Sequence, residues 1–286
     1  MTYREAYDLG CDRLKKADIP EAALDARLML ELVCGTDRNT LLAHGDREVT
    51  DAEQGRYEDL LVRRAQHIPL QHLTGFQNFM GLDFAVNEHV LIPRQDTEIL
   101  VEEVLRDLHD GMRILDLCTG SGCILLSLLS YSNDCVGVGA DLSDKALEMA
   151  EENYRRFREN REQMQARFVQ GDLYQALPEG EERFDRIVSN PPYIRSDVVD
   201  TLMPEVREHE PRMALDGTPD GLFFYREITK GAGRWLVPGG SLYYEIGHDQ
   251  AEDVRAILEQ EGFGEIRVVQ DYAGLDRVIC GTLKKR

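Results

Sequence analysis

The first 67 residues place their apolar side chains at helical rather than strand spacing. Thr2 and Glu5 have the pattern of a capping box, in which each side chain satisfies a backbone N–H at a helix start, and Thr50 and Glu53 repeat it. Pro20 suits the first turn of another helix. The pattern predicts helices over residues 2–17, 20–35, 37–43 and 50–66.

The pattern then changes to that of strands. Two apolar runs, residues 73–79 and 82–86, flank Met80-Gly81 and predict a β-hairpin that links the helical part to the rest of the chain. A helix through about residue 108 follows Ile92-Pro93-Arg94, and Asp96 or Thr97 is expected to cap it. Arg94 is a cation just before this helix, which is either a surface residue or, as the family resemblance described below implies, a wall of the cofactor pocket.

From residue 113 onward, short apolar runs alternate with helical patterns. Strands are expected over residues 113–117, 136–141, 168–174, 184–188, 239–247, 266–269 and 277–280, and helices over 124–130, 144–159 and 250–262. This alternation, closed by two late strands, predicts an α/β fold with a mostly parallel sheet and an antiparallel edge. Residues 194–219 are expected to form a long loop, and His209 to be a loop residue rather than a base.

A glycine-containing turn follows the first of these strands. Its residues are Cys118, Thr119, Gly120, Ser121 and Gly122. Glycine allows a tight turn and a close approach of the backbone to a ligand. Such a turn can bind a dinucleotide or S-adenosylmethionine, but the spacing departs from the dinucleotide fingerprint. Asp116, just before the turn, would repel a pyrophosphate and suits a cationic group such as the amino group of a methionine moiety.

Two further acids end the next two strands. Asp141 is placed to accept hydrogen bonds from both hydroxyls of a ribose. Asp172 is placed to accept from an adenine amino group, and Leu173 to cover the ring. Any one of these acids could be a helix cap or a solvated loop residue. Three acids at three successive strand ends, with Asn190 at the fourth, predict a nucleoside site.

The fourth strand ends in Asn190-Pro191-Pro192-Tyr193. The prolines lack an N–H and stop the strand, so Asn190 is left at its carboxyl end, where open α/β sheets bind ligands. The Asn190 side-chain oxygen and the Pro191 carbonyl are two acceptors that suit a planar –NH2 group. Tyr193 offers a flat face for that group. The motif therefore predicts a site that orients a weak nitrogen nucleophile, although a proline-terminated turn has the same short sequence.

Composition narrows the class of protein. The 286 residues carry 53 acids against 33 Lys and Arg, a formal net charge of −20, which disfavours a nucleic-acid partner unless the charge reflects a salt-rich cytosol. There is no apolar run of membrane-spanning length and no signal peptide at the N-terminus, so a cytoplasmic protein without a membrane partner is expected. The six cysteines show no metal-binding spacing, so neither disulfides nor a metal are expected.

Taken together, several motifs resemble the PrmC/HemK family over essentially the whole chain. They are Leu91-Ile92-Pro93-Arg94, the run from Asp116 to Gly122, Asn190 to Ile194, Glu210-Pro211-Arg212 and Gly274-Leu275-Asp276-Arg277. The resemblance implies a Rossmann-like, seven-stranded S-adenosylmethionine-dependent methyltransferase domain. It implies glutamine N5 methylation of the Gly-Gly-Gln loop of class 1 peptide chain release factors, by an enzyme expected to be a monomer. Family members often carry an aromatic residue where Leu173 stands, and proline where Gln95 stands.

The resemblance also assigns roles. Cys118 to Gly122, Asp141 and Asn190 would line the cofactor site, and Asn190, Pro191, Pro192 and Tyr193 would hold the glutamine amide. The organisation expected is a helical bundle for substrate docking (residues 1–72), a hairpin linker (73–90) and a methyltransferase domain (91–286). From sequence alone, the bundle could equally serve only to pack on the main domain.

Two other functions remain open from the sequence. One is methylation of an exocyclic amine on a base in DNA or RNA, which presents the same –NH2 geometry. The acidic charge and the lack of a basic stripe disfavour it. The other is a catalytically silent docking protein that keeps a cofactor pocket, which the intact Asn190 motif disfavours.

Overall fold

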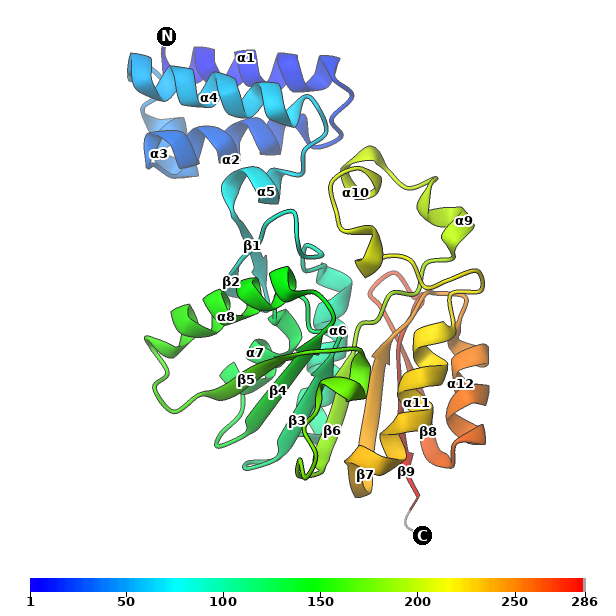
Figure 1. Cartoon of the computed structure of the whole chain (residues 1–286). Coiled ribbons are helices and arrows are strands. Elements are labelled where there is room, and N and C mark those ends of the chain that lie inside the picture. Colours follow the sequence, from blue (N-terminus) through cyan, green and yellow to red (C-terminus); the bar gives the residue numbers. More distant parts are fainter. Residues whose placement is uncertain (285–286) are drawn as a thin grey trace. The chain divides into compact units, whose positions relative to one another are not determined.

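The structure, a computed structural model, describes residues 1–284 and divides the chain into two compact units (Figure 1). The helical unit comprises Met1–Phe76 together with the distant segment Met203–His209. The sheet unit comprises Gln77–Leu202 and the chain from Glu210 onward. The chain therefore passes between the units at three places in the sequence. Within residues 1–284, no helix combines the length and the apolar character needed to cross a membrane.

The helical unit begins with the predicted helices. They are α1 (Tyr3–Lys16), α2 (Ala22–Cys34), α3 (Arg38–Ala43) and α4 (Asp51–Arg64). Both capping boxes are present, since the Thr2 and Thr50 hydroxyls accept from the backbone N–H groups of Glu5 and Glu53, whose carboxylates accept from the two threonine N–H groups. The buried core includes Tyr3, Leu14, Met29, Leu30, Tyr57 and Leu61.

A short helix, α5 (Leu70–Thr74), occupies residues where the sequence predicts the start of a strand. Leu70 and Leu73 pack into the core of the helical unit, and Gly75 ends the helix in the left-handed conformation with φ 81°. The hairpin therefore begins later, with β1 (Phe76–Phe79) and β2 (Leu82–Ala85). The predicted turn at Met80-Gly81 is confirmed.

The sheet unit contains the expected seven-stranded sheet. Its strands are β3 (Arg113–Leu117), β4 (Val136–Asp141), β5 (Gln165–Gln170), β6 (Phe184–Ser189), β7 (Leu236–Glu245), β8 (Phe263–Gln270) and β9 (Asp276–Leu283). Their spatial order is β5-β4-β3-β6-β7-β9-β8. Neighbours from β5 to β7 pair in parallel, and β9 runs antiparallel to both β7 and β8.

Helices cover both faces of this sheet (Figure 1). They are α6 (Gln95–Asp107), α7 (Cys123–Ser130), α8 (Asp144–Arg158), α11 (Phe223–Trp235) and α12 (Ala251–Gln260). Successive strand residues face opposite sides. Ile114 packs in one core with α6 and α7, whereas Leu115 packs in the other with α11 and α12. Both faces are buried, which explains the near-continuous apolar runs in the central strands.

The structure corrects several predicted boundaries. β5 ends at Gln170, so Asp172 lies beyond the strand, next to a 3-10 turn (Leu173–Ala176). Arg94, and neither Asp96 nor Thr97, is the N-cap of α6. The expected loop over residues 194–219 contains α9 (Ser196–Val199), α10 (Pro204–Arg207) and a 3-10 turn (Arg212–Ala214). Helix α11 was not predicted.

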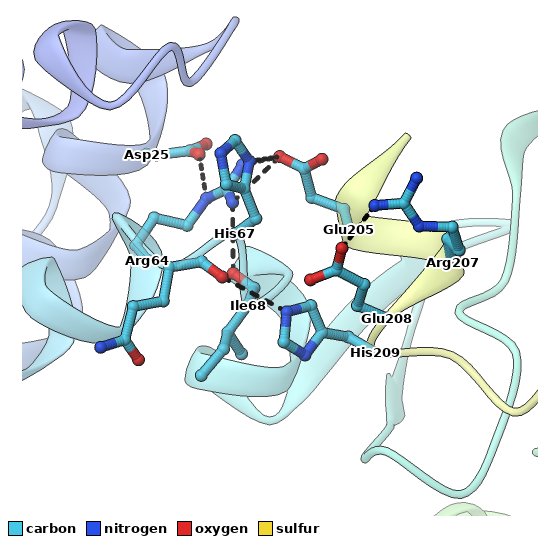
Figure 2. A network of polar contacts seen from close by, with 9 residues as sticks. Asp25, Arg64, His67, Ile68, Glu205, Arg207, Glu208 and His209 are labelled. Atoms are coloured by element: carbon cyan, nitrogen blue, oxygen red, sulfur yellow. Dashed lines mark hydrogen bonds and ion pairs between the residues drawn. The ribbon is translucent and has the colours of Figure 1, made fainter. Parts of the chain in front are cut away.

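Helix α10 belongs to the helical unit, where a network of charges holds it (Figure 2). The Arg64 guanidinium donates to the Asp25 carboxylate at 2.7 Å, to Glu205 Oε1 at 3.3 Å and to the Ile68 carbonyl at 3.2 Å. His67 Nδ1 lies 3.1 Å from the same Glu205 oxygen. Each of the three nitrogens of the buried Arg64 guanidinium thus donates to at least one acceptor.

Candidate functional site

The order of the strands creates a switch point between β3 and β6. The chain runs outward from β3 to β4 and β5, then returns to place β6 on the other side of β3. Leu117 of β3 lies opposite Ala140 of β4 and Ser189 of β6, so the residues that follow all three leave the sheet at the same edge. Ligands of open α/β sheets bind at such a point, outside the carboxyl ends of the strands.

A cavity of about 260 Å³ opens at this edge. The predicted site residues that line it are Cys118, Gly120, Asp141, Asp172, Leu173, Asn190 and Pro192. They come from four separate segments that the fold brings together. The sequence did not single out the other lining residues, which include His89, Val90, Met213, Asp216 and Phe224.

Asp141 organises the glycine turn. Its Oδ2 accepts from the Gly120 N–H at 2.9 Å and its Oδ1 from the Ser143 N–H at 2.9 Å. Burial raises the pKa of Asp141, although these backbone donors oppose the rise. Gly120 has φ 55°, and apart from Gly120 and its two chain neighbours no described residue has an atom within 4 Å of where a Cβ would stand. A ligand can therefore approach the backbone closely here, and each Asp141 oxygen retains a lone pair for it.

The charge of the cavity indicates its ligand. Three of the lining side chains are aspartates, Asp141, Asp172 and Asp216, and none is lysine or arginine among the residues described. A pyrophosphate would meet only negative charge, so the donor set does not fit a dinucleotide. Acceptors beside the apolar side chains Val90, Leu173 and others fit a nucleoside that carries a cationic group, as in S-adenosylmethionine.

Asn190 stands at the wall of this cavity, directly after β6. Its side-chain Nδ2 donates to the Thr97 hydroxyl of α6 at 3.3 Å. This contact orients the carboxamide and leaves Oδ1 to accept a hydrogen bond from a bound group. Thr97, which the sequence suggested only as a helix cap, is therefore an orienting partner. The prediction that Asn190 lies beside the nucleoside pocket is consistent with this placement.

Other predicted residues are buried within the glycine turn and do not line the cavity. Asp116 is fully buried, and its Oδ2 accepts from the Thr119 hydroxyl at 2.6 Å. Burial raises the pKa of Asp116 to about 7. Its Oδ1 has no hydrogen-bond partner among the described residues. Ser121 and Gly122 are likewise inside the turn, where Gly122 is the N-cap of α7.

Pro191 is buried, and Tyr193 lines a different hollow from Asn190. That hollow has a volume of about 580 Å³ and is also lined by Gly247 and Arg277. The Tyr193 hydroxyl donates to Glu245 Oε1 at 3.1 Å. The four-residue motif thus forms a partition, with Asn190 on the side of the acidic cavity and Tyr193 on the other.

Arg94 and His209, the two basic residues considered in the sequence analysis, do not line the acidic cavity. Arg94 does not line the acidic cavity, contrary to expectation, because its guanidinium pairs with Glu210 at 2.5 Å. Glu210 also accepts from the Ile92 N–H at 3.2 Å, which fixes the segment before α6. His209 lies in the helical unit, where its Nε2 is 3.3 Å from the Gln66 carbonyl, so it is a loop residue as expected.

The sequence reasoning missed Glu245, the last residue of β7. It is 2% exposed, accepts from Tyr193, and carries a raised pKa because of burial. The rule that found Asp141, an acid at the carboxyl end of a strand, applies equally to Glu245 and would have found it.

Comparison with protein families gives two matches. Residues 5–75 match the PrmC N-terminal domain, and residues 94–207 match the methyltransferase small domain.

Comparison with curated proteins and solved structures extends these matches. A release factor glutamine methyltransferase of Caulobacter vibrioides is 42% identical over 99% of this chain and 96% of its own length. One from Geobacter sulfurreducens is 40% identical over 99% of this chain and 97% of its own. A methyltransferase structure from Pyrococcus furiosus is 17% identical, with a TM-score of 0.52 over 73% of this chain and 91% of that one, which supports the fold.

Proposed function

The chain belongs to the release factor glutamine methyltransferase family, and on that premise we propose that it methylates N5 of the glutamine in the Gly-Gly-Gln motif of class 1 peptide chain release factors. S-adenosylmethionine is the donor. The observation that carries the proposal is the position of Asn190 at the wall of an acidic, nucleoside-sized cavity. The proposal also places the protein in the cytoplasm, where release factors act.

The cavity residues hold the donor. Asp141 accepts from the ribose hydroxyls, Asp172 from the adenine amino group, and Leu173 covers the ring. The bound donor supplies a methyl group attached to a positively charged sulfur. The aspartates that line the cavity favour that charge, whereas they would repel a phosphorylated ligand.

The Asn190 segment holds the acceptor. Asn190 Oδ1 and the Pro191 carbonyl accept from the two N–H bonds of the glutamine amide, which fixes the plane of that group. An amide nitrogen is a weak nucleophile because its lone pair is delocalised, so orientation must supply much of the acceleration. Well-oriented reactants can account for about 7–11 kcal/mol of a barrier. The same two acceptors stabilise the positive charge that grows on nitrogen, and water takes the released proton.

The helical unit docks the release factor. Its exposed apolar side chains include Leu42, at 72% exposure, and Leu32, at 49%. Such side chains offer contact area to a protein partner. A Leu42→Asp variant should raise KM for the intact release factor while leaving KM for a short Gly-Gly-Gln peptide unchanged. An unchanged KM for both substrates would remove Leu42 from the docking surface.

The test is a methyl-transfer assay with labelled S-adenosylmethionine and, in separate reactions, a class 1 release factor, DNA and RNA. We expect label in the release factor, at the Gly-Gly-Gln glutamine by peptide mass spectrometry. Asn190→Ala should lose most single-turnover activity, by about 100-fold, while calorimetric affinity for S-adenosylmethionine falls much less. Label that appears only in a nucleic acid, or an Asn190→Ala variant with normal turnover, contradicts the proposal.

A further inference from the structure

Tyr193 is held at both ends by residues from the carboxyl end of β7 and the turn after it. Its hydroxyl donates to Glu245 Oε1 at 3.1 Å, and its backbone carbonyl accepts from Gln250 Nε2 at 3.1 Å. Glu245 and Gln250 are 2% and 8% exposed. Both hydrogen bonds are partly buried, and because they act on the hydroxyl and on the backbone carbonyl, they restrain both the ring and the main chain of Tyr193.

Gln250 is itself fully engaged. Its Oε1 accepts from the Gly247 N–H at 2.9 Å and from the Tyr225 hydroxyl at 3.3 Å, and its Nε2 also donates to the Gly221 carbonyl at 3.2 Å. These four bonds lock the side chain in one rotamer. The main chain is equally tight, since a Cβ on Gly221, whose φ is 72°, would lie 2.5 Å from the Tyr193 carbonyl oxygen.

Glu245 connects the two ends of the Asn190 motif. One of its oxygens accepts from Tyr193, and the Thr97 hydroxyl is among the groups that lower the pKa of Glu245, against the larger effect of burial, which raises it. Thr97 is the residue that accepts from Asn190 Nδ2. Arg277 also lowers that pKa. The carboxyl group therefore lies among partners of both Asn190 and Tyr193.

The hydrogen-bonding capacity of Glu245 is not exhausted by these contacts. Its Oε2 is buried and has no hydrogen-bond partner within residues 1–284. A carboxyl group that served only to stabilise the fold would be expected to have both oxygens satisfied, as those of most buried polar side chains are. Neither Glu245 nor Gln250 lines the acidic cavity, so they do not touch the reacting atoms there.

We infer that Glu245 and Gln250 are positioning residues for the proposed methyl transfer: they hold Tyr193 at its hydroxyl and its carbonyl, and so set the orientation of the Asn190–Tyr193 segment that binds the glutamine amide. This inference rests on the proposed function. A misplacement of about 1 Å at such a segment can cost about 100-fold in rate. The cofactor lies on the other side of the partition and should bind normally.

The test measures kcat, KM for a class 1 release factor, and calorimetric affinity for S-adenosylmethionine in the full chain. Tyr193→Phe keeps the ring and removes the hydroxyl, and we expect kcat to fall about 10-fold with cofactor affinity within about threefold of wild type. Glu245→Ala and Gln250→Met should lower kcat by about 10-fold to 100-fold in the same way. Glu245→Gln, which keeps an acceptor for Tyr193, should stay within a few-fold of wild type.

A double-mutant cycle separates this role from general support of the fold. If Glu245 acts through the Tyr193 hydroxyl, the double variant Glu245→Ala, Tyr193→Phe loses no more kcat than Glu245→Ala alone. Glu252→Ala removes an acid 91% exposed on the adjacent helix and is the matched control, with no effect expected. Additive losses, or cofactor affinity that falls in parallel with kcat, overturn the inference.

Two outcomes remain distinct from these. If Glu245→Ala does not fold, Tyr193→Phe and Gln250→Met still decide, because normal turnover in both overturns the inference. If the wild-type protein transfers no methyl group to the release factor, the proposed function is refuted, and the inference about Glu245 and Gln250 that rests on it is refuted as well.

Discussion

The two units of this protein each contain a pair of buried or half-buried carboxylates, and the two pairs differ in how they are hydrogen-bonded. In the helical unit, Asp25 and Glu205 share Arg64, whose side chain is 7% exposed and whose three nitrogens each donate to an acceptor (Figure 2). In the sheet unit, Asp116 and Glu245 are buried, and each has one carboxylate oxygen without a partner in the described part of the chain. The first arrangement fixes a local structure, whereas the second is typical of functional sites, which keep perturbed groups near a ligand.

The pKa directions reflect this difference. Burial raises the pKa of Glu205, but its own backbone N–H, His67 and Arg64 together outweigh that effect and bring the pKa below its usual value. Asp25 is buried more deeply, so its pKa is raised despite Arg64. In the sheet unit burial prevails at Asp116, Asp141, Glu210 and Glu245, whose pKa values are all raised. Asp107 is an exception, because hydrogen bonds from Arg267 and Tyr243 lower its pKa despite burial.

The largest effect should come from removing the shared cation. Arg64→Met leaves two carboxylates without their partner, and breaking a buried pair in this way costs about 3–5 kcal/mol of stability. Urea unfolding followed by circular dichroism measures the loss. The neighbouring Arg63 pairs with Asp59 at 4.0 Å and is 46% exposed, so Arg63→Met is the matched control and should change stability by less than about 1 kcal/mol. Equal losses in the two variants would mean that the Arg64 network contributes no more to the free energy of unfolding than an exposed ion pair does.

The next effect concerns pH and the sheet unit. The pKa of Asp116 is about 7 when folded, against 3.8 for the free group, so the folded state binds a proton that the unfolded state does not. The stability that this proton confers is complete below the unfolded pKa and is lost as pH rises through the folded one. The slope is at most about 1.4 kcal/mol per pH unit.

Asp116→Asn removes this titration. We expect wild-type stability, relative to that of the Asn variant, to fall between about pH 4 and pH 7 and to level off above. Urea unfolding of both proteins at a series of pH values gives this difference directly. A difference that stays constant with pH would show that folding does not raise the pKa of Asp116.

A smaller effect is expected from the orienting contact of Asn190. Thr97→Val keeps the shape of the side chain but removes the hydroxyl that accepts from Asn190 Nδ2. Losing one such hydrogen bond costs about 0.5–1.5 kcal/mol, which corresponds to a fall of about twofold to tenfold in kcat. Thr40→Val, at a threonine in the short helix α3, is the control, since Thr40 belongs to the helical unit and takes no part in the contact with Asn190. Unchanged kcat in Thr97→Val would exclude an orienting role.

The smallest effect concerns Glu205 in acid. Its folded pKa is lowered, so the stability it contributes is present above the unfolded value of about 4.3 and is lost as pH falls through the folded one. We expect wild type to lose more stability than Glu205→Gln between about pH 5 and pH 3, as measured by thermal unfolding. If the two proteins lose stability equally as the pH falls, the network does not lower the pKa of Glu205.

Much of this fold could be predicted from local patterns. The capping pairs Thr2–Glu5 and Thr50–Glu53 marked two helix starts because both partners of each cap lie within one turn of the chain. The polar ends of the parallel strands indicated the site edge. α5 was missed because Leu70, which is buried, and Leu73, which is half-buried, pack into a core formed by distant helices, and the short sequence alone does not distinguish a helix from a strand.

By itself the sequence determined the strand-and-helix alternation, the glycine turn and the position of Asn190 at a strand end, because each depends on residues close together in the chain. Only the tertiary structure decided that Arg64 meets Glu205, that Arg94 pairs with Glu210 rather than lining the cavity, and that Glu245 meets Tyr193. These contacts join residues 52 to 141 positions apart. The packing of the helices and strands determines which side chains come into contact across such separations. Local propensity depends only on neighbouring residues and carries no information about these contacts.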